Sequence, residues 1–278
     1  MSLAPTLYTA PATTACPLSE LAATSIGAVQ RGERAQVVFD LDDTLFLVRP
    51  RKRVIFRELA ETHEEGDPTR EALYRLSLAE IPYDVKEALG NVGIHHGPTV
   101  KRLIDAFFAR FFDGAYTAHD AANAGAATYL NHLHANGVDV VYLSGRPEEM
   151  LDRTIDTLVA SGFPLVHGAT PVILKGRHEM HLGDAEFKGV KGFEIAAKGP
   201  VTGCFDNEPA NLNAMYPAMR DARFFLLDTD HSPNPPALEM PTIVMKDFGR
   251  MVNRLEASLA ATPRFGAGGW TLKVETGT

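Results

Sequence analysis

The stretch that decides the fold is residues 37–45, which read VVFDLDDTL. Val37 to Phe39 are β-branched or aromatic and favour a buried strand. Carboxylates follow directly, and charge at the end of a buried strand is costly unless a cation or a reaction requires it. Asp40 and Asp42 are two residues apart, so in an extended segment their side chains point to the same side. One could then attack an electrophile while the other carries a proton; the alternative is an acidic cap without chemistry.

The composition is that of an ordinary globular protein. With 278 residues, 45% hydrophobic and 22% charged, the chain is long enough for one large domain or a domain with an insert. The net charge of -8 argues against a nucleic-acid binder that acts through a basic surface. Two cysteines, Cys16 and Cys204, give neither a disulfide framework nor a metal-ligand spacing. Because no secretory signal or long apolar run is visible, we expect a cytoplasmic protein without a membrane span.

Short apolar runs alternate with helix-favouring stretches in the second half of the chain. The predicted strands are residues 138–143, 171–174, 201–205 and 223–227, and the predicted helices are 121–135, 148–161, 186–197 and 208–219. A short N-terminal tail precedes another predicted helix, 18–30. The alternation implies βαβ units, and so an α/β fold with a parallel sheet flanked by helices. Ligands of such sheets bind at the carboxyl ends of the strands.

A helical segment interrupts this alternation. Residues 48–117 contain the predicted helices 55–63, 68–78 and 98–112 and little that reads as strand. The pattern predicts a core made of residues 1–47 and 118–278, with the insert emerging just after the acidic strand. An insert at that position could lie over the sheet edge as a lid that excludes water and selects the substrate. The alternative is that these helices merely pack on the sheet.

A second chemical candidate follows the strand at 138–143. Ser144 and Gly145 stand at its end, before Arg146 and a helix that starts near Pro147. A hydroxyl and free N–H groups at such a junction can bind an anion, phosphate for example. The same residues would also suit a plain strand-to-helix turn.

Two further candidates lie near later strand ends. Lys188, early in a predicted helix, could neutralise an attacking carboxylate and a phosphoryl group; Lys191 shares its helix face, and Lys175 ends the preceding strand. Asp206 again follows a buried strand, and with Asp40 and a main-chain carbonyl it would suit Mg²⁺, which prefers oxygen ligands. Helix capping is the competing role for Asp206 or its neighbour.

Together these residues resemble the four motifs of the haloacid dehalogenase superfamily of hydrolases. The matching residues are, in order, Asp40-Leu41-Asp42-Asp43-Thr44, Ser144-Gly145-Arg146, Lys188 and Asp206-Asn207-Glu208. The resemblance covers roughly residues 36–47 and 121–229 and implies a Rossmann-like core. The insert lies between the first and second motifs, a position similar to that of the helical cap in one class of the superfamily.

The resemblance implies a role for each matched residue. Asp40 would be the nucleophile that forms an aspartyl-phosphate, and Asp42 would protonate the leaving oxygen and later deprotonate water. Lys188 would balance charge. Because the dehalogenases lack an aspartate at the position of Asp42, phosphoryl transfer is preferred over dehalogenation.

The remaining matched residues would bind the substrate and the metal. Thr44 would steady the loop around the phosphate, and Ser144, with Gly145 and Arg146, would bind the phosphate itself. Mg²⁺ would be held by Asp40, the carbonyl of Asp42, and Asp206. Many members carry a second aspartate where this chain has Asn207, followed by Glu208; Asn207 could still ligate through its oxygen or hold a metal-bound water.

The sequence therefore predicts a Mg²⁺-dependent phosphatase that acts on a small or medium phosphomonoester. A phosphotransferase or mutase would carry the same residues, and a non-catalytic binding module would be favoured only if Asp40 or Asp42 were lost. A nucleic-acid or nucleotide end-processing phosphatase is a narrower alternative, suggested by a basic run at the start of the insert: Arg49, Arg51, Lys52, Arg53 and Arg57. Such a run is more often a solvated helix face. The pattern indicates no oligomeric state.

Overall fold

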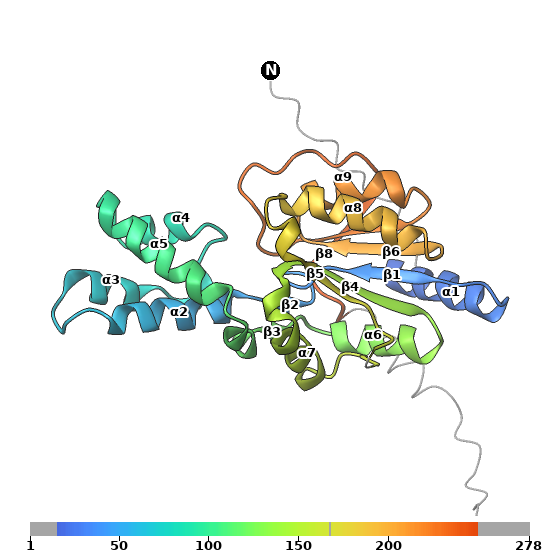
Figure 1. Ribbon diagram of the computed structural model, residues 1–278, viewed down its shortest axis with the longest axis horizontal. Coiled ribbons are helices and arrows are strands. Elements are labelled where there is room, and N and C mark those ends of the chain that lie inside the picture. The colour runs from blue at the N-terminus through green and yellow to red at the C-terminus, as the bar shows by residue number, and fades with distance from the viewer. Residues whose placement is uncertain (1–15, 167, 250–278) are drawn as a thin grey trace, which may run out of the picture.

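The computed structural model describes residues 16–166 and 168–249. Its centre is a six-stranded parallel sheet in the order β5-β4-β1-β6-β7-β8 (Figure 1). The strands are β1 (Gln36–Phe39), β4 (Asp139–Pro147), β5 (Val172–Lys175), β6 (Val201–Asp206), β7 (Arg223–Leu227) and β8 (Thr242–Met245). The predicted parallel α/β sheet is confirmed. Most of the predicted tail, and the outer parts of the predicted core at 1–15 and 250–278, lie outside the described residues.

Helices cover both faces of this sheet. One face packs on α1 (Pro17–Gln30), α6 (Ala126–Ala135) and α7 (Leu151–Ala160), and the other on α8 (Asp184–Ala196) and α9 (Pro209–Met215) (Figure 1). Successive side chains of β1 point to opposite faces of the sheet. Val37 and Phe39 pack in the apolar layer beneath α1, α6 and α7, and Val38 packs in the layer beneath α8 and α9. All three are buried, as expected for a central parallel strand.

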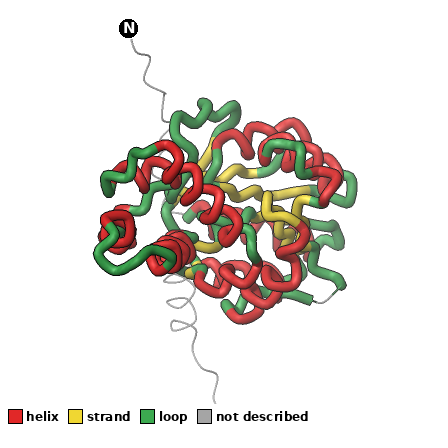
Figure 2. Tube along the Cα trace, turned by 60° about the vertical axis from the view of Figure 1, so that its left-hand side comes forward, coloured by secondary structure: helices red, strands yellow, loops and turns green. Residues whose placement is uncertain are grey.

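The helices α2 (Arg49–Glu61), α3 (Pro68–Arg75), α4 (Val85–Asn91) and α5 (Gly97–Phe111) stand to one side of the sheet (Figures 1 and 2). They pack around an apolar core of their own, which includes Phe56, Leu59, Leu89 and Phe107. We call residues 48–117 the helical lobe. An antiparallel ribbon of β2 (Phe46–Leu47) and β3 (Ala121–Ala122) joins its two ends to the core. The chain therefore leaves the sheet and returns to it at adjacent points.

Several predicted boundaries differ from the observed ones. The predicted helix 121–135 starts instead at Ala126, because Gly125 turns the chain with a φ of 77° after the short strand β3. The predicted helix 55–63 starts earlier, at Arg49, with Pro50 in its first turn. The sequence did not indicate α4 or β8, which have seven and four residues.

Short 3₁₀ turns lengthen or link several helices: η1 (Leu78–Glu80), η2 (Gly114–His119), η3 (Glu148–Met150), η4 (Arg177–Glu179) and η5 (Tyr216–Ala218). Among the described residues, no helix is both long and apolar enough to cross a bilayer.

Candidate active site

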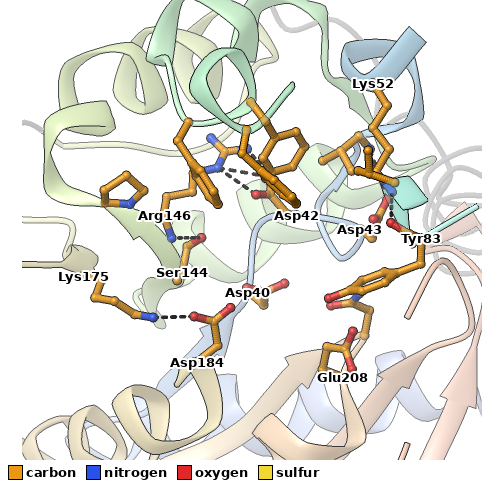
Figure 3. A pocket seen from close by; sticks show the side chains of 18 of the residues that line it. Asp40, Asp42, Asp43, Lys52, Tyr83, Ser144, Arg146, Lys175, Asp184 and Glu208 are labelled. Carbon is orange, nitrogen blue, oxygen red and sulfur yellow. Dashed lines mark hydrogen bonds and ion pairs between the residues drawn. The ribbon is translucent and has the colours of Figure 1, made fainter. Parts of the chain in front are cut away.

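Packing between two central strands fixes Asp40 at the carboxyl edge of the sheet. The rings of Phe39 in β1 and Phe205 in β6 stack with their centroids 4.7 Å apart. The N–H of Asp40 donates to the carbonyl of Phe205 at 3.0 Å, which continues the ladder by one residue. Asp40 is consequently 5% exposed, and its carboxylate stands at the floor of a cavity (Figure 3).

The chain turns sharply just beyond Asp40. The carbonyl of Leu41 accepts hydrogen bonds from the N–H groups of residues 44–46, and Asp43 adopts a left-handed φ of 55°. An aspartate tolerates that conformation better than most residues. The turn buries Leu41 completely and leaves Asp40 and Asp42 on the same cavity.

Lys188 joins two carboxylates that come from neighbouring strands. Its Nζ lies 2.6 Å from Oδ1 of Asp40 and 2.7 Å from Oδ2 of Asp206. The lysine is only 2% exposed, so both ion pairs are shielded from water. Asp206 ends β6, and Lys188 lies in the first half of α8, the helix that precedes β6 in the chain.

The other two candidate lysines lie elsewhere. The Nζ of Lys191 is 2.8 Å from Glu179, away from the cavity. Lys175 does line the cavity, but its Nζ contacts Asp184 at 2.5 Å and the carbonyl of Leu182 at 3.1 Å (Figure 3). Lys188 is therefore the lysine that this geometry places against Asp40.

Burial and neighbouring charges shift the pKa values of Asp40 and Lys188. It raises the pKa of Asp40 above its ordinary value; Lys188 opposes the rise, and the charge of Asp206 adds to it. Burial alone would lower the pKa of Lys188, but Asp206 and Asp40 outweigh it and raise that pKa. Two carboxylates share one ammonium group, which leaves one negative charge unbalanced in a shielded place.

These residues fit a hard divalent cation. Asp40 and Asp206 offer carboxylate oxygens that converge from adjacent strands, and their excess negative charge favours a metal ion. Within residues 16–166 and 168–249, no group of three or more His, Cys, Asp or Glu residues forms a metal site. A metal here would therefore draw on two carboxylates, backbone or amide oxygens, and the substrate, which is how Mg²⁺ is often bound.

Asp206 is held by the chain that follows it. Its Oδ1 accepts hydrogen bonds from the N–H of Glu208 at 2.9 Å and from Nδ2 of Asn211 at 3.0 Å. Asn211, on the first turns of α9, also lines the cavity, and the sequence reasoning missed it. Its place in the first turn of the helix that follows Asp206 is the signal that could have found it, because that turn begins at the carboxyl end of β6.

Asn207 and Glu208 bind the loop after β7. Nδ2 of Asn207 donates to the carbonyl of Asp230 at 2.6 Å. The carboxylate of Glu208 accepts hydrogen bonds from the N–H and hydroxyl of Ser232, at 2.7 and 2.6 Å. Both residues line the cavity. Glu208 also interacts with Tyr83 of the helical lobe; burial and this carboxylate raise the pKa of the tyrosine (Figure 3).

Ser144 and Gly145 lie at the same edge, beside Asp40. Ser144 is 2% exposed, its Oγ accepts the N–H of Arg146 at 3.3 Å, and it lines the cavity (Figure 3). A Cβ on Gly145 would lie 2.7 Å from the carboxyl group of Asp184, so a larger residue there would require the Asp184 side chain to move. This hydroxyl and the nearby backbone are available to an anion at the cavity floor.

Arg146 occupies a different position from the one expected of a phosphate ligand. Its guanidinium contacts the carboxylate of Asp42, with Nε 3.1 Å from Oδ1, and its NH2 group lies 2.9 Å from Asp120. NH1 donates to the hydroxyl of Thr154 at 3.1 Å. The side chain is 1% exposed. Its donors are thus directed to Asp42, Asp120 and Thr154, and direct binding of phosphate by Arg146 stays a prediction.

A second arginine, from the helical lobe, completes the same network. NH2 of Arg51 lies 2.8 Å from Asp42 and 2.5 Å from Asp120, and its Nε is 2.7 Å from Asp120. The guanidinium is fully buried and stands 4.5 Å from the centroid of the Phe111 ring. Burial alone would raise the pKa of Asp42, but Arg146 and Arg51 outweigh it and hold that pKa well below its usual range.

One cavity of about 560 Å³ contains these groups. The core supplies Asp40, Asp42, Ser144 and Lys188. The helical lobe supplies residues from α2, α4 and α5 and from the loop that contains Tyr83. The lobe thus forms one wall of the space into which the carboxylates of the core project (Figure 3).

Thr44 lies behind the cavity wall. It is fully buried, its hydroxyl is 3.5 Å from Oδ1 of Asn207, and its carbonyl accepts from Asn123 at 3.0 Å. These contacts agree with a residue that steadies the loop, and a contact with a substrate stays a prediction. The basic run at 49–57 is only partly exposed: Arg51 and Lys52 are buried and Arg49 pairs with Asp230, whereas Arg57 faces solvent.

Comparison with known proteins shows that part of this chain is similar to hydrolases. A family model of haloacid dehalogenase-like hydrolases matches residues 36–171. No curated protein sequence matches the chain. A solved structure of a candidate phosphatase from Clostridium difficile is 11% identical, covers 80% of this chain and 99% of its own, and has a TM-score of 0.53.

Another similar structure is that of CbbY from Rhodobacter sphaeroides in complex with phosphate. It is 13% identical, covers 78% of this chain and 95% of its own, and has a TM-score of 0.47. At such identities the likeness concerns the fold alone. The family model, the parallel sheet and the ordered residues at its carboxyl edge agree with one another, and residues 36–171 belong to the haloacid dehalogenase-like hydrolases.

Proposed function

We propose that this protein is a Mg²⁺-dependent phosphomonoester hydrolase in which Asp40 carries the phosphoryl group. The observation that carries the proposal is the bridge of Lys188 between Asp40 and Asp206, at the floor of a cavity that also contains Asp42. A phosphate dianion needs positive charge and hydrogen-bond donors around it before a carboxylate can approach. Lys188 supplies charge there, and Ser144 supplies a hydroxyl.

The reaction has two steps. In the first, an oxygen of Asp40 attacks phosphorus, the bond to the ester oxygen breaks, and Asp42 gives a proton to the leaving alcohol. In the second, Asp42 takes a proton from water, whose oxygen attacks the phosphorus of the aspartyl-phosphate. Inorganic phosphate leaves and the carboxylate of Asp40 is restored.

The arginine contacts of Asp42 suit the second step, because they hold it as a carboxylate that can accept a proton. The first step requires that Asp42 carry a proton. We therefore expect its contacts with Arg51 and Arg146 to lengthen once the substrate is bound.

Mg²⁺, when bound, supplies positive charge against the phosphate and the attacking carboxylate. Asp40, the carbonyl of Asp42, and Asp206 would hold it, with the amide oxygen of Asn207 close by. Lys188 balances the remaining charge of the carboxylates and keeps their orientation.

The helical lobe acts in this proposal as a cap, with residues 48–117 as its bounds. Its residues line the cavity above Asp40, and Tyr83 reaches Glu208 of the core. A cap of this kind would exclude water other than the attacking molecule and would contact the alcohol part of the substrate.

The test is phosphate release by the purified protein with Mg²⁺, from an aryl phosphate and from an alkyl phosphate. Asp40→Asn keeps the shape of the side chain and should reduce release below detection, whereas EDTA should stop the reaction and Mg²⁺ should restore it. Asp42→Asn should slow release from the alkyl ester by about 10²–10⁴-fold and from the aryl ester less, because an alkoxide needs the proton more.

Asp139→Asn is the matched control, since Asp139 lies at the opposite end of β4 and pairs with the exposed Arg34. Full turnover by Asp40→Asn would overturn the mechanism. Detection of a phosphorylated second alcohol in place of inorganic phosphate would change the reaction from hydrolysis to phosphoryl transfer.

A further inference from the structure

One wall of the cavity above Asp40 is aromatic. Helix α5 contributes Phe107, Phe108 and Phe111 to it, and Phe112 follows directly at the C-terminal end of the helix. Phe107 and Phe111 are four residues apart, as are Phe108 and Phe112, so the four rings form two adjacent rows along the helix. The neighbouring lining residues of the lobe include Val85 and Ile104, which are also apolar.

The two rows have different surroundings. Phe107 is buried in the core of the lobe, where its ring lies 5.0 Å from that of Phe56. Phe108 and Phe112, in contrast, are 41% and 46% exposed. Their rings stack on each other with centroids 5.8 Å apart and an interplanar angle of 17°. Large apolar side chains exposed together at a cavity are typical of a binding surface.

Two of the cations around this wall, Lys52 and Lys175, already have partners. Lys52 is 5% exposed, and its Nζ donates to the carbonyls of Pro82 and Tyr83 at 3.3 Å each. Lys175 is also 5% exposed and is bound to Asp184. These cations are therefore not available to a charged or polyhydroxylated alcohol.

The other polar lining residues of the lobe offer few fixed partners to such an alcohol. Asp84 caps α4 by accepting the N–H of Glu87 at 3.0 Å, and Tyr83 interacts with Glu208. Lys86 is exposed to solvent. A sugar bound here would bury hydroxyl groups against rings, which costs free energy when no hydrogen bond replaces those to water.

We propose that the substrates of this site are phosphomonoesters whose alcohol part carries an aromatic ring, which stacks on Phe108 and Phe112 while the phosphate lies at Asp40. The inference rests on the proposed phosphatase function and names its substrate class. A cavity of about 560 Å³ has room for a phosphate group and a group of one or two rings. Stacked rings favour a flat partner over an alkyl chain because the faces can meet in an offset arrangement.

The test compares alkyl phosphates of similar leaving-group chemistry. Benzyl phosphate, cyclohexylmethyl phosphate and glycerol 3-phosphate are assayed for phosphate release with Mg²⁺. We expect kcat/KM to be highest for benzyl phosphate. Phe108→Leu and Phe112→Leu keep apolar bulk but remove the ring, and each should lower kcat/KM for benzyl phosphate by about 3- to 10-fold. Release from glycerol 3-phosphate should change by less than about twofold.

Phe193→Leu is the matched control. Phe193 lies in α8, is 57% exposed and does not line the cavity, so its replacement should leave every rate unchanged. The inference is overturned if glycerol 3-phosphate is turned over as well as benzyl phosphate, if the cyclohexyl ester equals the benzyl ester, or if the leucine variants affect all esters alike.

A binding measurement separates failure of this inference from failure of the proposed function. Benzylphosphonate and 2-hydroxyethylphosphonate, which contain no ester bond to hydrolyse, are titrated calorimetrically into the protein with Mg²⁺. Tighter binding of benzylphosphonate, weakened about 3- to 10-fold in Phe108→Leu, supports the aromatic wall even if no ester is hydrolysed. Equal binding of the two phosphonates overturns it, whatever the turnover.

Discussion

The buried network of Arg51, Arg146, Asp42 and Asp120 allows a quantitative prediction about stability. Arg51 is fully buried and contacts both carboxylates, and the side chain of Asp120 is also fully buried. Two guanidinium groups and two carboxylates make the network neutral as a whole. Arg51→Met would keep much of the side-chain volume but leave one negative charge in excess.

The expected cost follows from which charge is left without its partner. Asp42 is 27% exposed at its side chain and can be solvated in part, whereas Asp120 cannot. Removing one partner of a buried ion pair typically costs about 3–5 kcal/mol, because the remaining charge stays desolvated. We therefore expect Arg51→Met to lower the free energy of unfolding by about 3–5 kcal/mol.

The double variant Arg51→Met with Asp120→Asn restores neutrality, since Arg146 and Asp42 then form one pair. We expect it to recover at least about 2 kcal/mol relative to the sum of the two single variants, which is the size of coupling found between residues in one buried network. The measurement is urea unfolding followed by circular dichroism for the four proteins of the cycle.

Arg223→Met is the control, because Arg223 pairs with Glu20 where the two side chains are 41% and 36% exposed. Its loss should cost under about 1 kcal/mol. The reasoning is refuted if Arg51→Met costs no more than Arg223→Met, or if the two substitutions in the network are additive.

Two further predictions concern other parts of the molecule. Lys188→Met leaves Asp40 and Asp206 without their shared cation, so Mg²⁺ should raise the melting temperature of this variant by more than that of the unsubstituted protein. Equal increases in the two melting temperatures would show that the metal does not bind beside these carboxylates. Gly125→Ala should lower the free energy of unfolding, measured by urea titration, by about 1–3 kcal/mol. The reason is that Gly125 has a φ of 77° and that a Cβ would lie 2.8 Å from the backbone carbonyl carbon of Phe248. An unchanged urea midpoint would mean that the turn before α6 adjusts freely.

The sequence predicted the residues at the sheet edge because their signals are local. Asp40 and Asp206 each follow a short buried strand, and the strands of a parallel sheet all end at one edge. The position of Lys188 was harder to predict, since Lys191 and Lys175 fitted the same pattern. What distinguishes the three is the packing of α8 on the sheet, which directs Lys188 to Asp40 and Lys191 to Glu179.

The role of the insert could not be predicted in the same way. Arg51 and Lys52 belong to a charged run that, by pattern, indicates a solvated helix face, and the apolar pattern predicts a helix only from residue 55. In the structure these charges are buried because acids far away in the sequence, Asp120 and Asp230, fold back onto them. Charge pairing over such separations leaves no periodic signal, so the first turns of α2 were missed.

The aromatic wall and the arginine network meet at Phe111. Its ring lines the cavity and lies under the guanidinium of Arg51, 4.5 Å away, and Arg51 in turn holds Asp42. A substrate that shifts this ring would also shift a contact of the proposed acid and base, so the alcohol part of the substrate can influence proton transfer through the lobe. A substitution at Phe111 would therefore change binding and chemistry together. Phe108 and Phe112 pack edge-on against the Phe111 ring, so they stand one contact further from Arg51.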